Sequence, residues 1–154
     1  MKRILVSVTG EVQASAQTVY TILADYQQHH PRILPGSYFT NLVVEAGGLG
    51  AGTVFQAQMN VFGSKRTFRM RVAEPEPGRV LSETDLDTGL ITTFTVAPIA
   101  AERCTVTIAT EWQARAGFGG WVQRLTMPSF MRRIYRAELQ QLDEYAQAQG
   151  SSSM

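Results

Sequence analysis

One long amphipathic segment, residues 118–147, constrains the fold of this chain more than any other feature. Its large apolar residues recur at steps of three or four and their sums, which predicts one helix with a single apolar face, bent at Pro128. Such a helix spans about 45 Å and needs a broad, curved sheet to cover that face. The apolar stripe consists of Phe118, Trp121, Leu125, Met131, Tyr135, Leu139 and Leu142, whereas Arg124, Arg132, Arg133, Arg136, Glu138 and Asp143 fall mostly off it.

The chain before this helix is predicted to be mostly strands. Alternation of apolar and polar residues predicts a first strand ending near Val12. Helical spacing after Ser15, a plausible cap, predicts a helix ending near Asp25 or Tyr26, and a short second helix is expected within 27–34. Turn residues then separate six further strands, which makes seven in an antiparallel meander: 39–46, 53–62, 65–74, 79–86, 90–98 and 103–113.

Alternation within the strands separates an inward from an outward face. Arg69 and Arg71 are expected on the outward face, in cross-strand ion pairs with Glu83 and Glu111. With these residues outside, the inward faces offer almost no ionisable group. The residues expected inward are Phe55, Ala57, Met59, Val61, Phe68, Met70, Val72, Leu90, Thr92, Phe94, Val96, Cys104, Val106, Ile108, Thr110 and Trp112.

Composition limits the class of protein. With 154 residues, of which 44% are hydrophobic, the chain fits one domain, expected at residues 1–149, with a disordered tail at 150–154. A net charge of +1 favours neither nucleic acid nor an anionic membrane as a general partner. The sequence has no run of eighteen apolar residues and no apparent secretion signal, so we expect a cytoplasmic protein without stable membrane insertion. Its single cysteine, Cys104, excludes an internal disulfide.

The predicted order of strand, two short helices, six strands and a long helix resembles the helix-grip fold of START domains and plant pollen allergens. Three segments are similar to the bacterial polyketide cyclase/dehydrase-like branch of that SRPBCC superfamily: Ala24-Asp25-Tyr26, residues 47–53 and residues 132–139. The resemblance implies an α+β fold, with the curved sheet wrapped around the last helix. It also implies a hydrophobic cavity between them, used in the superfamily for lipids, sterols, hormones or polyketides. It supplies no catalytic motif.

Other motifs are weak on their own. The glycine-rich segment Gly47–Thr53 feeds a strand and lacks a following lysine, so a hairpin turn is favoured over a phosphate-binding loop. His29 and His30 have no neighbouring partner in the sequence and are expected to have a surface or capping role. No third residue stands at metal-ligand spacing from this pair or from Cys104, so neither a metal nor a cofactor is expected.

The sequence therefore favours a binding or carrier protein for a small hydrophobic ligand, with an oligomeric state it does not specify. An enzyme of the cyclase, aromatase or dehydratase type and a protein-interaction domain remain alternatives. His30 is expected beside the mouth of the cavity. The candidate ligand-binding residues are His30, Phe55, Ala57, Met59, Phe68, Met70, Thr92, Phe94, Ile108, Thr110, Trp112, Leu125, Met131 and Tyr135.

Overall fold

The structure is a computed structural model that describes residues 3–61, 63–113 and 118–152. For residues 118–127 and 150–152, and for Val61 and Ser64, it describes the backbone and not the side chain. Leu125, a candidate ligand-binding residue, therefore lies outside the described side chains.

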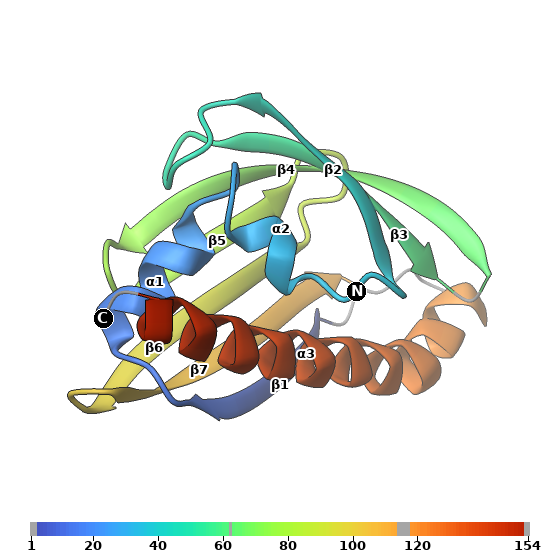
Figure 1. The fold of residues 1–154 in the computed structure, drawn as a ribbon. Helices are drawn as coiled ribbons and strands as arrows, with labels where there is room; N and C mark the ends of the chain where they lie inside the picture. The colour runs from blue at the N-terminus through green and yellow to red at the C-terminus, as the bar shows by residue number, and fades with distance from the viewer. Residues whose placement is uncertain (1–2, 62, 114–117, 153–154) are drawn as a thin grey trace.

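A seven-stranded antiparallel sheet forms most of the molecule and curls around the last helix (Figure 1). Its strand order is β1-β7-β6-β5-β4-β3-β2, so the first strand pairs with the last and every other pair follows the chain. The predicted α+β helix-grip fold is confirmed. The strands are β1 (Arg3–Val12), β2 (Phe39–Ala46), β3 (Val54–Val61), β4 (Ser64–Glu76), β5 (Val80–Asp85), β6 (Ile91–Ala100) and β7 (Arg103–Gln113).

Two short helices follow β1. In α1 (Ala16–Ala24) the Ser15 hydroxyl accepts a 3.1 Å hydrogen bond from the backbone N–H of Thr18, so the expected cap is present. α2 (His30–Ile33) begins at His30, with Pro31 in its first turn. The residue before a proline favours an extended conformation, so the sequence predicts that His30 is extended. That expectation is wrong, because proline in the first turn of a helix removes only an amide that has no partner within the helix.

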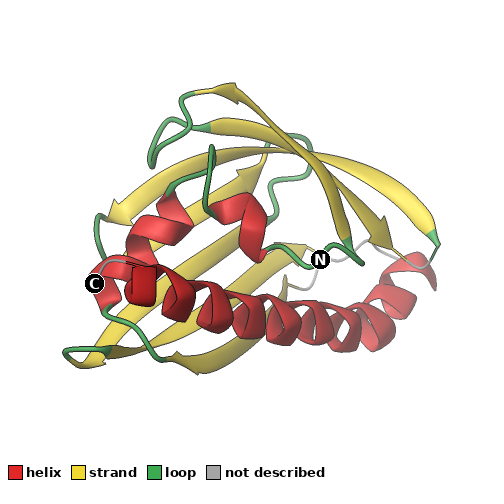
Figure 2. Cartoon of the chain, in the orientation of Figure 1, coloured by secondary structure: helices red, strands yellow, loops and turns green. Residues whose placement is uncertain are grey.

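The long helix α3 (Phe118–Ser152) lies across the concave face of the sheet (Figure 2). It contains Pro128 without ending there, and it runs five residues beyond the predicted end at Gln147. Gly10 on β1 permits its close approach, since a Cβ atom at that position would lie 3.1 Å from Leu139 Cδ1. The described side chains of α3 that are buried are Met131, Ile134, Tyr135, Glu138, Leu139, Leu142 and Ala146.

The glycine-rich segment is a turn between β2 and β3, as predicted. Gly47, Gly48 and Gly50 have positive φ angles, which side chains with a Cβ atom adopt at a cost. The turn is held against the end of α1, because Tyr26 N–H donates to Gly48 O and Gly50 N–H donates to Ala24 O, each at 2.8 Å.

The structure corrects the predicted position of two carboxyl groups. Glu83, expected on the outward face, has only 8% of its surface exposed, and Glu138, expected off the apolar stripe, has 3%. On the outer face, Arg69 instead pairs with Glu45 and Arg3 with Glu111, each at 2.9 Å. The interior therefore contains ionisable groups that the predicted strand faces lacked.

Candidate functional site

Most of the candidate ligand-binding residues lie on the concave side of the sheet or on the facing side of α3. Of the positions that alternation placed inward, Phe68, Leu90 and Trp112 are only partly buried against the core, the side chain of Val61 is not described, and the others are buried. The buried candidates are His30, Phe55, Ala57, Met59, Met70, Thr92, Phe94, Ile108, Thr110, Met131 and Tyr135. His30, with 2% of its surface exposed, lies in the core and not at a surface opening.

Strand register places one row of polar side chains across the middle of the sheet. Glu83 on β5 is paired with Thr92 on β6, which in turn is paired with Thr110 on β7. The hydroxyls of Thr92 and Thr110 are 2.8 Å apart, and the Thr110 hydroxyl also contacts the phenol of Tyr135 from α3. This row links the sheet to α3 through hydrogen bonds inside an otherwise apolar interior.

Glu83 lies at one end of that row, beside two aromatic side chains from the α1–α2 region. The phenol of Tyr26 donates a 2.6 Å hydrogen bond to Glu83 Oε2. The Tyr26 ring is stacked between His30, at a centroid distance of 4.4 Å, and Phe55, at 4.9 Å. Phe94 meets His30 edge-on. The carboxyl group is thus held against an aromatic wall.

The protonation of His30 follows from its contacts. Its Nδ1 atom is 2.7 Å from the carbonyl oxygen of Leu23, and because a carbonyl oxygen only accepts, Nδ1 carries the hydrogen. Burial lowers the pKa of His30 from 6.5 to about 4, against the opposing effect of the Leu23 hydrogen bond. The ring is therefore neutral at pH 7, and its Nε2 atom is an acceptor 3.6 Å from Glu83 Oε2.

Two of the buried carboxyl groups, those of Glu83 and Glu138, hold their protons more tightly than exposed ones do. Burial raises the pKa of Glu83 to about 7, although the hydrogen bond from Tyr26 acts in the opposite direction. Burial, and next the charge of Glu83, raises the pKa of Glu138 well above its usual range. Glu138 Oε1 has no hydrogen-bond partner in the described structure. A buried carboxyl oxygen without a partner is costly, which points to a site built for more than stability.

Sequence reasoning missed both of these carboxyl groups and Tyr26. A signal for Glu138 was present, because it follows Ile134 by four residues and precedes Leu142 by four, and this spacing places it on the buried side of α3. Glu83 carried a weaker signal. Glu83 and Leu81 point to the same face of β5, and Val80 points to the other. Because both faces carry an apolar residue, alternation alone does not say which face of β5 is inward.

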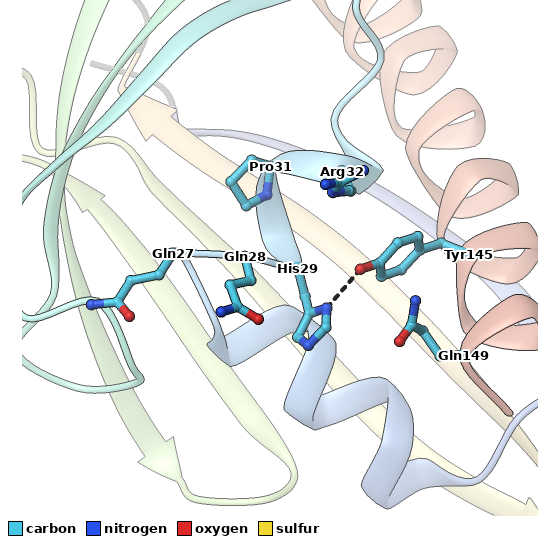
Figure 3. Close-up of a pocket in the computed structure, with 7 residues that line it drawn as sticks. All are labelled: Gln27, Gln28, His29, Pro31, Arg32, Tyr145 and Gln149. Carbon is cyan, nitrogen blue, oxygen red and sulfur yellow. Dashed lines mark hydrogen bonds between the residues drawn. The ribbon is translucent and has the colours of Figure 1, made fainter. Parts of the chain in front are cut away.

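A separate polar groove lies outside α2, between the α1–α2 loop and the C-terminal part of α3 (Figure 3). In it, His29 Nδ1 is 2.6 Å from the Tyr145 hydroxyl, and His29 Nε2 is 3.9 Å from an Asp25 carboxyl oxygen. None of the candidate ligand-binding residues lines this groove, which is formed by Gln27, Gln28, His29, Pro31, Arg32, Tyr145 and Gln149. The contact between His29 and Tyr145 joins the start of α2 to α3, and the groove is separate from the interior.

Comparison with known families shows to which protein family this chain belongs. Residues 3–147 match the pattern of the family described as polyketide cyclase/dehydrase and lipid transport. The chain belongs to this family. The predicted resemblance to that branch of the START-like superfamily is confirmed. No curated protein matches the chain.

Solved structures share the fold of this chain. The KanY protein is 26% identical, with a TM-score of 0.82 over 96% of this chain and 99% of KanY. The Zhui aromatase/cyclase from Streptomyces sp. R1128 is 20% identical, with a TM-score of 0.79 over 95% and 94% of the two chains. A START superfamily protein from Mycobacterium smegmatis is 14% identical, with a TM-score of 0.66 over 97% and 99%. Within the described part of the chain, no helix is long and apolar enough to span a bilayer.

Proposed function

We propose that this protein binds a small hydrophobic molecule, of lipid or polyketide-like type, between its curved sheet and α3. The proposal rests on a difference in burial, because the inward-facing residues are more exposed at one end of the interior than at the other. At the end of the interior formed by β3, β4 and the middle of α3, inward residues keep 4% to 8% of their surface exposed: Phe55, Ala57, Met59, Met70, Met131 and Tyr135. Residual exposure at inward positions supports space that the neighbouring side chains do not fill.

The other end of the interior, near α1, contains several side chains with no exposed surface, although Tyr20 keeps 8% of its surface exposed. Val19, Leu23, Val96, Val106 and Leu142 have no exposed surface. This contrast supports a structural core near α1 and a ligand site nearer β3 and β4. Access is proposed beside α3 at that less packed end, where large apolar side chains are only partly buried: Tyr38, Phe39, Phe68, Trp112 and Phe130.

The chemistry of the lining supports a ligand that is mostly apolar. Methionine side chains from β3, β4 and α3 are flexible and adapt to ligands of different shapes. The hydroxyls of Thr92, Thr110 and Tyr135 contact one another, and their remaining lone pairs can accept a hydrogen bond that orients the ligand. Family membership supports the same reading, since the family description includes lipid transport.

Blocking variants test this proposal. A panel of oleic acid, cholesterol and anthraquinone is titrated while tryptophan fluorescence and the melting temperature are measured. At least one compound is expected to change the fluorescence saturably and to raise the melting temperature, because a ligand that binds only the folded state stabilises it. Ala57→Trp and Met131→Trp are expected to abolish both effects by filling the site.

Gln56→Trp is the matched control, because Gln56 lies next to Ala57 on β3 but is exposed. It is expected to bind the compound as the unaltered protein does. If no compound of the panel binds, or if both blocking variants bind as well as the control, the interior is not the ligand site.

A second candidate function, an acid–base enzyme acting on a bound polyketide-like chain, is favoured by the position of Glu83. A general base works best when its pKa lies near the working pH, and burial raises the pKa of Glu83 to about 7. Glu83→Gln is then expected to lower turnover of a poly-β-ketone thioester about a hundredfold or more, with unchanged affinity. Equal rates with and without the protein would exclude this candidate for that substrate.

The protein-interaction alternative receives no specific support. The large apolar side chains that are exposed come from separate strands and turns: Leu5, Val43, Leu49, Leu86 and Ile99.

A further inference from the structure

The interior contains an imbalance between hydrogen-bond acceptors and donors around the carboxyl groups of Glu83 and Glu138. The Tyr26 hydroxyl donates its hydrogen bond to Glu83. The hydroxyls of Thr92, Thr110 and Tyr135 contact one another. Glu138 Oε1, on a residue with 3% of its surface exposed, has no hydrogen-bond partner in the described structure. The described side chains therefore leave at least one buried carboxyl oxygen without a hydrogen-bond partner.

His30 adds another acceptor at the same place. The Nδ1–H group of His30 donates to the Leu23 carbonyl oxygen, so Nε2 carries a lone pair and no hydrogen. The Nε2 atom lies 3.6 Å from Glu83 Oε2. Two acceptors at this distance repel unless a hydrogen or a positive charge lies nearby. We refer to His30 on α2, Glu83 on β5 and Glu138 on α3 as the cluster, since His30 faces Glu83 and the charge of Glu83 acts on Glu138.

The cluster also lacks a compensating charge. No lysine or arginine is among the buried residues whose side chains the structure describes. Glu83 and Glu138 lie near enough for the charge of one to affect the pKa of the other. Two buried carboxyl groups without a cation are costly when ionised, and a ligand that brings a positive charge removes that cost.

We propose that the hydrophobic ligand carries a basic amine, and that Glu83 and Glu138 hold its ammonium group beside the aromatic wall of Tyr26, Phe55 and Phe94. This inference rests on the proposed function, because the apolar body of the ligand occupies the interior described above. An ammonium group has three hydrogens to donate and no lone pair to accept, which matches a cluster that is short of donors. Hydrogen bonds between charged groups are stronger than neutral ones and give the selectivity.

Binding of the amine is linked to the protonation of Glu83 and Glu138. Burial and the charge of Glu83 raise the pKa of Glu138 well above its usual range, which favours the protonated form of this carboxyl group. Binding of an ammonium favours the ionised form of both carboxyl groups, so a proton leaves the cluster when the amine enters. The other titratable side chains facing these carboxyl groups are His30, Tyr26 and Tyr135, all of which stay neutral at pH 7 because burial lowers the pKa of the first and raises that of the other two.

Three probes of similar size test the proposal: phenethylamine, phenethyl alcohol and ethylbenzene. Their dissociation constants are measured by calorimetry at neutral pH, with thermal shift as a second readout. The amine is expected to bind about tenfold or more tightly than the alcohol, since it adds a charge-assisted hydrogen bond. If the alcohol and the hydrocarbon bind and the amine binds no more tightly, the inference is wrong while the proposed function stands. If none of the three binds while a compound of the first panel does, the inference is wrong and the proposed function stands; if no compound of either set binds, both fail.

Two isosteric variants then locate the ammonium site. Glu83→Gln and Glu138→Gln are each expected to remove most of the preference for the amine while changing the affinity for the alcohol less than about twofold. The two variants lie on different elements, so the proposal stays testable if one of them fails to fold. Glu144→Gln, an exposed position on α3, is the matched control and should keep the preference. Retention of the full preference in both interior variants overturns the assignment.

Discussion

The Tyr26 hydroxyl donates a 2.6 Å hydrogen bond to Glu83 Oε2 inside the molecule. Tyr26 directly follows the C-cap residue of α1, whereas Glu83 lies on β5, so this bond joins the helical region to the middle of the sheet. The Tyr26 ring also stacks on His30, the first residue of α2. The position of the interior carboxyl group therefore depends on how the two short helices pack.

Glu138→Gln is expected to stabilise the protein at high pH. The pKa of Glu138 is raised on folding, so its proton stabilises the folded state fully below pH 4.5, and this contribution is lost as the pH rises through the folded pKa. The variant has no such loss. Urea unfolding should give it a free energy of unfolding more than about 1 kcal/mol above the unaltered protein near pH 8, and a smaller gain near pH 5.

The exposed variant Glu144→Gln serves as the reference for this comparison. It should change stability by less than about 0.5 kcal/mol at both pH values. A Glu138→Gln protein that is equally destabilised at both pH values would mean that the carboxyl group is satisfied in the folded state.

His30→Ala is expected to destabilise the protein by about 3 kcal/mol at neutral pH, because it removes a buried ring and its hydrogen bond to Leu23. The variant should also be less sensitive to acid. Burial lowers the pKa of His30 to about 4, so its contribution is present above pH 6.5 and is lost as the pH falls through 4. Chemical unfolding at a series of pH values measures both effects, with the exposed Arg32→Ala as control.

The sheet and its long helix were predictable because their patterns are local. Alternation shows which face of β3, β6 and β7 is inward, since each strand has apolar residues at every second position. The spacing of Met131, Tyr135 and Leu139 fixes the facing of α3. These patterns located most of the residues that surround the interior.

The polar cluster could not be predicted in the same way. Its members come from separate elements, and the burial of His30 depends on how α2 docks against the sheet, which no local pattern encodes. Glu138 was placed off the apolar stripe, although it lies three residues after Tyr135 and four before Leu142. This spacing places Glu138 on the buried side of α3, where the structure has it.

Gly48→Ala is expected to destabilise the turn between β2 and β3. Gly48 has a φ angle of +136°, and a Cβ atom there would lie 2.3 Å from Gln27 Nε2. Backbone strain of this kind costs about 1 to 3 kcal/mol. Gly36→Ala is the matched control, because a Cβ atom at Gly36 meets nothing within 4 Å. Equal midpoints of urea unfolding for the two variants would show that the turn tolerates a side chain.

Cys104 is expected to be unreactive in the folded protein. It is buried on β7, and burial raises the pKa of its thiol to about 11, so the nucleophilic thiolate is scarce at neutral pH. Its reaction with a thiol reagent should be at least about a hundredfold slower in buffer than in denaturant. Rapid labelling of the native protein would place this thiol at the surface.

Methyl NMR of methionine and isoleucine side chains tests the central claim most directly. Met59, Met70 and Met131 face the interior from β3, β4 and α3, whereas Ile99 is exposed on β6. When a compound that raises the melting temperature is titrated in, we predict saturable shifts of the three methionine methyl signals and no shift of the Ile99 signal. If the compound binds while these methionine signals stay unchanged, the ligand does not lie between the sheet and α3.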